Sequence, residues 1–215
     1  LIWMNDKEAM LNSIRLKIKN GFKCLKLKIG AIDFSDELSL LAFIRKEFNS
    51  SELEIRVDAN GAFNKENALL KLNYLAKFDI HSIEQPIKPN QFSTMNKLCN
   101  ESPIPVALDE ELIGTINNQK KEALLDTISP KYIVLKPSLI GGLDSTKAWI
   151  KLAEKRKIKW WVTSALESNI GLNAIAQFTA EFDNKLPQGL GTGQIYNNNI
   201  PSFLELKADE IYIND

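Results

Sequence analysis

The sequence predicts the α/β class and, within it, a barrel or a doubly wound sheet of parallel strands and helices. Five charged residues recur at gaps of 30, 26, 25 and 27 positions, and they are Lys28, Asp58, Glu84, Asp109 and Lys136. Each of them ends a short apolar run, and each run is followed by turn residues and then by a helical pattern. A repeat of that length, with one strand and one helix in each unit, is typical of both architectures.

Short apolar runs predict eight strands. They cover residues 1–4, 24–28, 54–57, 82–84, 105–108, 132–135, 159–163 and 187–190. Gly30 follows the second strand, Pro86 the fourth and Pro137 the sixth. Glycine adopts backbone angles that other residues avoid, and proline lacks the N–H group that a strand needs, so these residues favour strand ends.

Apolar residues at helical spacing predict one helix after each of the first seven strands. The helices cover residues 6–20, 33–48, 65–78, 91–100, 119–125, 144–157 and 169–182. Gly21 closes the first helix, and the pair Gly141-Gly142 makes the turn into the sixth. Eight strands and seven helices predict a modified TIM barrel of the (β/α)7β type.

The chain beyond the eighth strand departs from the repeat. The pattern breaks after Gly193, and residues 197–199 are three asparagines. Residues 204–213 alternate between apolar and polar side chains, which favours a hairpin or an edge strand over an eighth helix. No linker or low-complexity segment divides the chain. We therefore expect one barrel domain over residues 1–201 and a C-terminal extension over residues 202–215.

Composition argues against several classes of partner. The 215 residues are 44% apolar and 25% charged, with 27 basic and 27 acidic side chains and a formal net charge of zero. A neutral chain without a basic block does not favour a nucleic-acid partner. No apolar stretch approaches the roughly 18 residues of a membrane span, and we expect a cytoplasmic protein with no membrane partner. Cys24 and Cys99 form no CxxC pair, so we expect two buried, reduced thiols.

Three carboxylates predict a metal site. Asp58, Glu84 and Asp109 end the third, fourth and fifth expected strands, which are neighbours in a barrel, and the carboxyl ends of barrel strands converge on one mouth. Three oxygen ligands with no nearby cysteine or histidine favour Mg²⁺, or else Mn²⁺, over zinc. The alternative is that each carboxylate caps a helix or pairs with a lysine.

Lysines flank this expected site. Lys26 and Lys28 are two positions apart on one strand, so their side chains point to the same side of the sheet. Lys136 ends the sixth strand, roughly across the barrel. Crowding by a metal ion and a second cation lowers the pKa of a lysine toward the range of a general base. The alternative for Lys26 and Lys28 is a solvated strand edge.

Two uncharged residues are candidates for substrate contact. Asn60 follows Asp58 by two positions and shares its facing, although a turn residue before Gly61 explains it equally well. Ser164 lies just beyond the seventh strand at the same mouth, and the alternative is an ordinary loop hydroxyl.

These motifs resemble those of the enolase superfamily over nearly the whole chain. They read KLKIG, RVDANGAF, IEQPI, ALDEEL, VLKPSLIGG and TSALESNIG, beginning at residues 26, 56, 83, 107, 134 and 163. A K-x-K motif with a lysine on the sixth strand resembles the muconate-lactonising subgroup. SALESNIG and GLGTGQIY, after the seventh and eighth strands, look most like the o-succinylbenzoate synthases. The run Asp109-Glu110-Glu111 departs from the Asp-Glu-Ser common in the subgroup.

The resemblance implies a reaction and a role for each residue. Asp58, Glu84 and Asp109 would bind Mg²⁺, and the metal would hold the carboxylate of a small-molecule substrate. Lys28 would remove the proton alpha to that carboxylate, and Lys26 would help to stabilise the enediolate. Loss of a hydroxyl group from the same face as the proton, a syn dehydration, would then give o-succinylbenzoate, an intermediate of menaquinone biosynthesis.

The resemblance also implies a second part of the polypeptide. Enzymes of this superfamily carry an N-terminal capping domain that closes the barrel mouth, and residues 202–215 resemble the segment that returns to it. In relatives that racemise their substrate, Lys136 would be the second base. The same motifs therefore leave an N-acylamino-acid racemase or dipeptide epimerase as an alternative. An alternative of another class is an inactive barrel that serves as a binding module.

Overall fold

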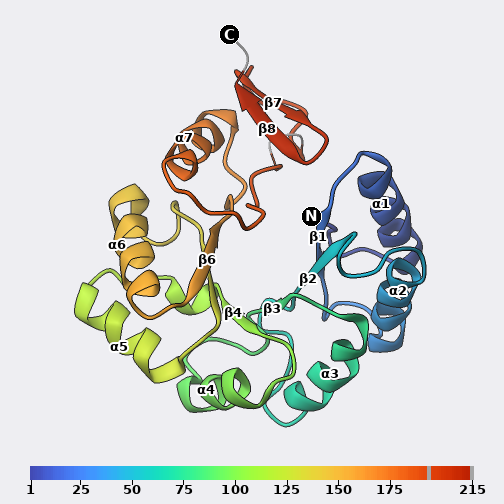
Figure 1. Ribbon diagram of the computed structural model, residues 1–215, viewed down its shortest axis with the longest axis horizontal. Coiled ribbons are helices and arrows are strands. Elements are labelled where there is room, and N and C mark those ends of the chain that lie inside the picture. Colours follow the sequence, from blue (N-terminus) through green and yellow to red (C-terminus); the bar gives the residue numbers. More distant parts are fainter. Residues whose placement is uncertain (193–194, 214–215) are drawn as a thin grey trace.

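A computed structural model describes residues 1–192 and 195–213 of the chain. Six parallel strands form one curled sheet in the order β1-β2-β3-β4-β5-β6, and helices surround it (Figure 1). The strands are β1 Cys24–Lys28, β2 Glu54–Asp58, β3 Ser82–Glu84, β4 Val106–Leu108, β5 Tyr132–Leu135 and β6 Lys159–Val162. The predicted β/α-barrel class is confirmed, with sequential strands as neighbours and a helix on each connection.

The helices form the outer layer. They are α1 Lys7–Lys19, α2 Phe34–Glu47, α3 Ala68–Leu75, α4 Phe92–Glu101, α5 Asn118–Ile128, α6 Gly142–Lys155 and α7 Asn169–Ala180. Two 3₁₀ turns, η1 Ala76–Phe78 and η2 Glu110–Leu112, follow α3 and β4. Among the described residues, no helix has the length and apolar character needed to cross a membrane.

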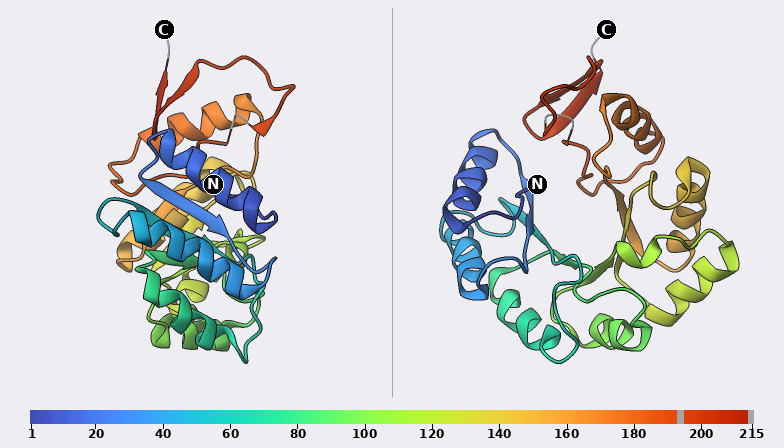
Figure 2. Two further views of the ribbon diagram at one scale, coloured as in Figure 1. Left: turned by 90° about the vertical axis from the view of Figure 1, so that its right-hand side faces the viewer. Right: turned by 180° about the vertical axis from the view of Figure 1, so that it is seen from behind.

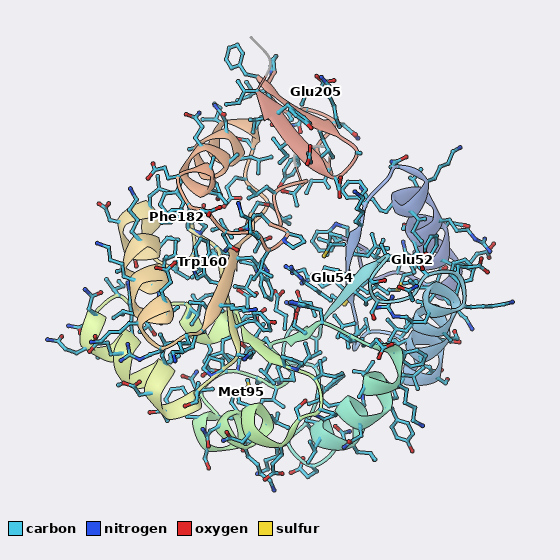
Figure 3. The ribbon with its side chains drawn as sticks, viewed as in Figure 1. Glu52, Glu54, Met95, Trp160, Phe182 and Glu205 are labelled. Carbon is cyan, nitrogen blue, oxygen red and sulfur yellow. The ribbon has the colours of Figure 1, made fainter. Side chains whose placement is uncertain are left out.

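The main hydrophobic core lies between the sheet and the helices. Leu25 and Leu27 of β1 are at most 1% exposed and belong to this core, whereas Lys26 and Lys28, which alternate with them, extend into the interior. At the other edge of the sheet, Trp160 of β6 belongs to the same core and packs edge to face on Phe182, with 5.4 Å between the ring centroids (Figure 3). The alternation of apolar and polar residues along β1 thus separates the core from the interior.

The first and eighth predicted strands are wrong in extent. In segment 1–4 only Ile2 pairs with β1, through hydrogen bonds to Lys26 O (2.8 Å) and from Lys28 N (3.0 Å). In segment 187–190 only Gly189 pairs, through bonds to Val162 O (2.8 Å) and from Ser164 N (3.1 Å). Pro187 has no N–H to donate, which shortens the pairing at that end.

The C-terminal segment forms the hairpin that its alternation predicts. Strands β7 Leu204–Lys207 and β8 Glu210–Ile213 are antiparallel. The hairpin lies between α7 and α1 in Figure 1 and in the right-hand view of Figure 2. Its turn approaches the end of α1, because a Cβ atom placed on Gly21 would lie 3.2 Å from Ala208 Cβ. The boundary between residues 201 and 202 stays a prediction, and Gly193 and Gln194 of the GLGTGQIY motif, like residues 214–215 of the tail, lie outside the described residues.

The close approach of Gly189 to Thr163 leaves no room for a larger residue at position 189. A Cβ atom at this position would lie 2.3 Å from Thr163 Oγ1 and 2.6 Å from Thr163 Cβ. Gly189→Ala should therefore lower the free energy of unfolding by about 1–3 kcal/mol, as overpacking typically does. Gly191→Ala is the matched control, because its Cβ would meet only Leu206 Cδ2 at 3.9 Å. Urea unfolding of both variants tests this, and equal midpoints for the two would contradict it.

Candidate active site

Strand register brings the charged residues to one end of the sheet. Lys28 of β1 pairs with Asp58 of β2, and Asp58 pairs with Glu84 of β3. Asp109 directly follows β4, and Lys136 directly follows β5. Because parallel strands end at the same edge, the five residues of the repeat lie together at the carboxyl end of the sheet.

Two lysines of β1 share one carboxylate. Lys28 Nζ lies 2.6 Å from Asp58 Oδ2, and Lys26 Nζ lies 3.1 Å from the same oxygen. Lys26 Nζ also lies 2.8 Å from Glu84 Oε2. Both lysines therefore face the interior, as their spacing predicts, and the alternative of a solvated strand edge is wrong for them.

Lys136 reaches the same group of carboxylates from β5. Its Nζ is hydrogen bonded to Asp109 Oδ2 and lies 4.0 Å from Glu84 Oε1. Asp58, Glu84 and Asp109 are 0%, 1% and 2% exposed. A buried carboxylate requires a cationic or hydrogen-bonding partner, and the lysines supply it.

Burial and charge oppose each other on the carboxylates. Burial acts to raise the pKa of Asp58, but Lys26 and Lys28 outweigh it and hold the pKa below its usual range. At Glu84, burial raises the pKa well above its usual value, and the Asp58 and Asp109 carboxylates add to the shift. A negative charge on Glu84 therefore needs further compensation by a cation.

Lys26 and Lys136 do not show the lowered pKa that the sequence predicts. Burial acts to lower the pKa of Lys26, but Glu84 and Asp58 outweigh it, so the pKa is raised. At Lys136, burial is likewise outweighed by Asp109 and Glu84, and the pKa is raised. The expectation assumed that a metal ion holds the carboxylates, whereas here each of these ammonium groups pairs with them directly.

Asn60 links Lys28 to a further carboxylate. Its Oδ1 accepts a 2.6 Å hydrogen bond from Lys28 Nζ, and its Nδ2 donates a 2.7 Å bond to Glu110 Oε1. Its backbone N–H donates to Asp58 Oδ1 at 3.0 Å, and its φ of 43° lies in the left-handed region. Asn60 therefore faces the site, as predicted, but both ends of its amide contact protein groups.

Ser164 stands apart from the lysine and carboxylate network. It is 5% exposed, its Oγ is hydrogen bonded to Thr192 Oγ1, and it accepts a 3.2 Å bond from the N–H of Leu166. A cavity of about 970 Å³ nevertheless joins Ser164 to Lys26, Lys28 and Lys136, which all line it. This volume falls within the range of roughly 300–1,000 Å³ that is typical of ligand pockets.

Gln85 is a site residue that the sequence did not predict. It is fully buried and directly follows Glu84, with a φ of 38° in the left-handed region. Its side chain contacts the residues after β4 and is described below. The only sequence signal is its position in IEQPI, because neither the backbone angle nor the contact across strands can be read from that motif.

The donor set fits a hard divalent cation. All three carboxylates offer oxygen ligands. Two of them already bind a cationic group, since Lys26 Nζ lies within 3.1 Å of both Asp58 and Glu84. In the described part of the chain, no three His, Cys, Asp or Glu side chains are arranged to hold a metal ion as they stand. The lysine ammonium groups occupy the same oxygens, so a metal ion would compete with them for Asp58, Glu84 and Asp109.

Cys24 lies at the other end of β1, inside the sheet. Its Sγ lies 3.3 Å from Glu54 Oε1, and Glu54 is labelled on β2 in Figure 3. Burial, with Glu54 nearby, raises the pKa of the Cys24 thiol to about 12. Burial also raises the pKa of Cys99 to about 12, with Glu111 adding to it. Both cysteines are free, as predicted, but each is only partly buried, so the prediction that they are fully buried is wrong.

These thiol pKa values predict slow alkylation. The thiolate is the reacting species, so a pKa near 12 should slow modification by iodoacetamide at pH 8 by roughly 10³-fold relative to an ordinary thiol. The same protein in 6 M guanidinium is the control and should react at the ordinary rate. Mass spectrometry of tryptic peptides measures both sites, and fast labelling of native Cys24 would contradict the prediction.

A curled parallel sheet with carboxylates and lysines at the carboxyl ends of its strands defines the class of β/α-barrel domains with a site at the barrel mouth. Within that class, the chain belongs to the family described as enolase C-terminal domain-like, whose model matches residues 9–209. The superfamily that the motifs resemble is thereby confirmed.

Three relatives show which members of the family this chain resembles. It is 56% identical to an o-succinylbenzoate synthase of Desulfotalea psychrophila over 204 residues, which are 95% of this chain and 55% of that protein. The crystal structure of MenC from Desulfotalea psychrophila matches with a TM-score of 0.91 and 52% identity, covering 99% of this chain and 58% of that one. An L-Ala-D/L-Glu epimerase of Bacillus subtilis is 26% identical over 92% of this chain and 55% of its own length. The chain thus spans about half the length of the relatives that it matches.

Proposed function

We propose that the protein containing this chain is an o-succinylbenzoate synthase, a carbon–oxygen lyase of menaquinone biosynthesis. The observation that carries the proposal is the 56% identity to an o-succinylbenzoate synthase, against 26% for the Bacillus subtilis epimerase. The substrate would be 2-succinyl-6-hydroxy-2,4-cyclohexadiene-1-carboxylate. A biosynthetic enzyme of this kind is expected in the cytoplasm.

Lys28 is the proposed base. Its Nζ would take the proton from the carbon next to the substrate carboxylate, leaving an enediolate. The hydroxyl group would then leave on the same face with that proton, so that one C–H and one C–O bond break, one C=C bond forms and water is released. The 2.6 Å contacts of Lys28 with Asp58 and Asn60 support this role, because they fix the position of the ammonium group from which the neutral base forms.

Asp58, Glu84 and Asp109 are the proposed ligands of Mg²⁺, with Mn²⁺ as an alternative. When bound, the metal supplies positive charge to the substrate carboxylate and lowers the cost of forming the enediolate. Their burial and the raised pKa of Glu84 support a site that is completed by a cation. Lys26, which contacts two of these carboxylates, would add positive charge beside the enediolate.

The remaining residues would hold the substrate. Lys136 would stabilise the enediolate as a cation from the opposite face, and its contact with Asp109 supports a position beside the reacting group. Ser164 would contact the substrate from the cavity wall, which it lines. Asn60 would contact the substrate only indirectly, through Lys28, because its amide already bonds Lys28 and Glu110.

We infer that a capping domain of the same polypeptide completes the site. The relatives are nearly twice as long as the matched segment, since this chain covers 55% of the Desulfotalea psychrophila enzyme. Residues 202–215 would return toward that domain.

A racemase or epimerase acting on an N-acylated amino acid or a dipeptide is the second candidate. The observation that favours it is the pair Lys28 and Lys136, which approach the carboxylates from β1 and β5 and would serve as bases on the two faces of one substrate. The distinguishing product is a deuterium-exchanged substrate without loss of water.

An ultraviolet assay of the cyclohexadiene precursor tests the proposed function. The protein, with its capping domain present, should form o-succinylbenzoate when Mg²⁺ is added and lose activity when the metal is removed by EDTA. Exchange of the alpha proton in D₂O without dehydration would contradict the lyase proposal and favour the racemase. Absence of both reactions would favour an inactive barrel that serves as a binding module.

A further inference from the structure

We propose that Gln85 is a positioning residue that holds Asp109 in place and thereby sets the affinity of the metal site. The second half of this inference rests on the proposed function, whereas the first half concerns this chain alone. Gln85 belongs to the segment after β3, and Asp109 begins the segment after β4.

The Gln85 amide uses all of its hydrogen-bonding positions. Oε1 accepts from the backbone N–H of Asp109 at 3.2 Å and of Glu111 at 3.3 Å. Nε2 donates to Ile87 O at 3.0 Å and to Glu111 Oε2 at 3.1 Å. A backbone N–H only donates and a backbone carbonyl only accepts, so these partners fix the orientation of the amide.

The backbone of Gln85 extends the same connection to both neighbouring strands. Its N–H donates to Ala107 O of β4 at 2.9 Å, and its carbonyl accepts from Gly61 N–H at 2.7 Å, in the segment after β2. One residue therefore joins the three segments that begin at or directly after the proposed metal ligands. Its φ of 38° costs energy for a residue with a Cβ atom, and the bonds on both sides maintain it.

Glu111 is the residue at which this chain departs from the Asp-Glu-Ser run common in the subgroup, and it also binds Gln85. It is 5% exposed, and its Oε1 accepts a 2.7 Å bond from the N–H of Asn90. Its other oxygen accepts from Gln85 Nε2, so the carboxylate is anchored to the segment after β3 at two points. Both carboxylate oxygens of Glu111 therefore accept hydrogen bonds from protein groups.

The consequence concerns the Asp109 carboxylate. Gln85 bonds the N–H of Asp109 itself, which restrains the backbone from which that carboxylate extends. Residues that orient a ligand without touching the metal typically change metal affinity or activity by about 10–100-fold when they are replaced. Gln85 is enclosed and does not need to contact the substrate to act in this way.

Three variants test the proposal on the full chain. Gln85→Glu keeps the oxygen that accepts from Asp109 and Glu111 but replaces the Nε2 donor by an oxygen that faces both Glu111 Oε2 and the carbonyl of Ile87. The double variant Gln85→Glu/Glu111→Gln restores a donor–acceptor pair between the two side chains. Thr179→Val is the control, because it removes one buried hydrogen bond, to Ile175 O at 2.7 Å, in α7. If Gln85→Glu does not fold, Glu111→Gln alone weakens the same contact.

The first measurement needs no metal ion. Amide hydrogen exchange by NMR should be about 10-fold faster at Asp109 and Glu111 in Gln85→Glu, and return to within about 3-fold of the parent in the double variant. Thr179→Val should leave both amides unchanged. Unchanged exchange in Gln85→Glu would overturn the positioning role.

The second measurement is the dissociation constant of Mn²⁺, followed by electron paramagnetic resonance. It should rise about 10–100-fold in Gln85→Glu and recover in the double variant. An unaltered constant, equal to that of Thr179→Val, would overturn the effect on affinity. If the parent protein binds no Mn²⁺, the proposed function and this effect both fail, and the exchange measurement still decides whether Gln85 holds Asp109.

Discussion

Replacing Lys28 with alanine should lower kcat for dehydration by about 10³–10⁴-fold, the largest effect expected in this protein. General base catalysis by a positioned side chain typically contributes 10²–10⁴-fold, and Lys28 is both proposed base and proposed proton donor. Its ammonium group is held at 2.6 Å by both Asp58 and Asn60, so no neighbouring group takes its place without rearrangement. The ultraviolet assay and deuterium exchange at the alpha carbon measure the loss.

Lys23→Ala is the matched control for this experiment. Lys23 directly precedes β1 and is exposed, so its removal should leave dehydration and proton exchange within about 2-fold of the parent. Circular dichroism and the unfolding midpoint show whether Lys28→Ala still folds. A folded Lys28→Ala variant that exchanges the alpha proton at the parent rate would exclude Lys28 as the base.

Glu84→Gln should have the second largest effect, through the metal. Glutamine keeps the shape of the side chain but removes the negative charge at the centre of the three carboxylates, where Lys26 contacts both Glu84 oxygens. We expect the Mn²⁺ dissociation constant to rise by at least about 100-fold. Activity should fall by roughly 10³-fold at a fixed Mg²⁺ concentration, because metal charge contributes several kcal/mol to such a step and each 1.36 kcal/mol is a factor of ten.

Glu101→Gln provides the comparison for Glu84→Gln. Glu101 ends α4 and is exposed, and its contact with Lys97 is 3.9 Å long. Exposed ion pairs contribute little, so this variant should keep the metal affinity of the parent. Equal Mn²⁺ affinities for Glu84→Gln and Glu101→Gln would remove Glu84 from the metal site.

Three strands and two terminal segments show how well the repeat predicts strand bounds. β1, β3 and β5 have the predicted bounds, because a glycine or proline follows each of them two positions after its last residue. Segment 1–4 is wholly apolar and segment 187–190 reads Pro-Gln-Gly-Leu, but each pairs at only one residue. Pairing depends on a neighbouring strand in register, and an apolar pattern alone does not supply one.

The sequence by itself determined the fold class, the residues that gather at the carboxyl ends of the strands and the shared facing of Lys26 and Lys28. These follow from periodicities of the chain, since each strand end recurs once in every unit and strand side chains alternate every second residue. Only the tertiary structure decided that the ammonium groups interleave with the carboxylates, and that Asn60 joins Lys28 to Glu110. It also decided that Gln85 joins three segments through a left-handed backbone and six hydrogen bonds. Apart from the local bond from Gln85 to Ile87, these contacts connect residues 22 or more positions apart, and no local pattern specifies them.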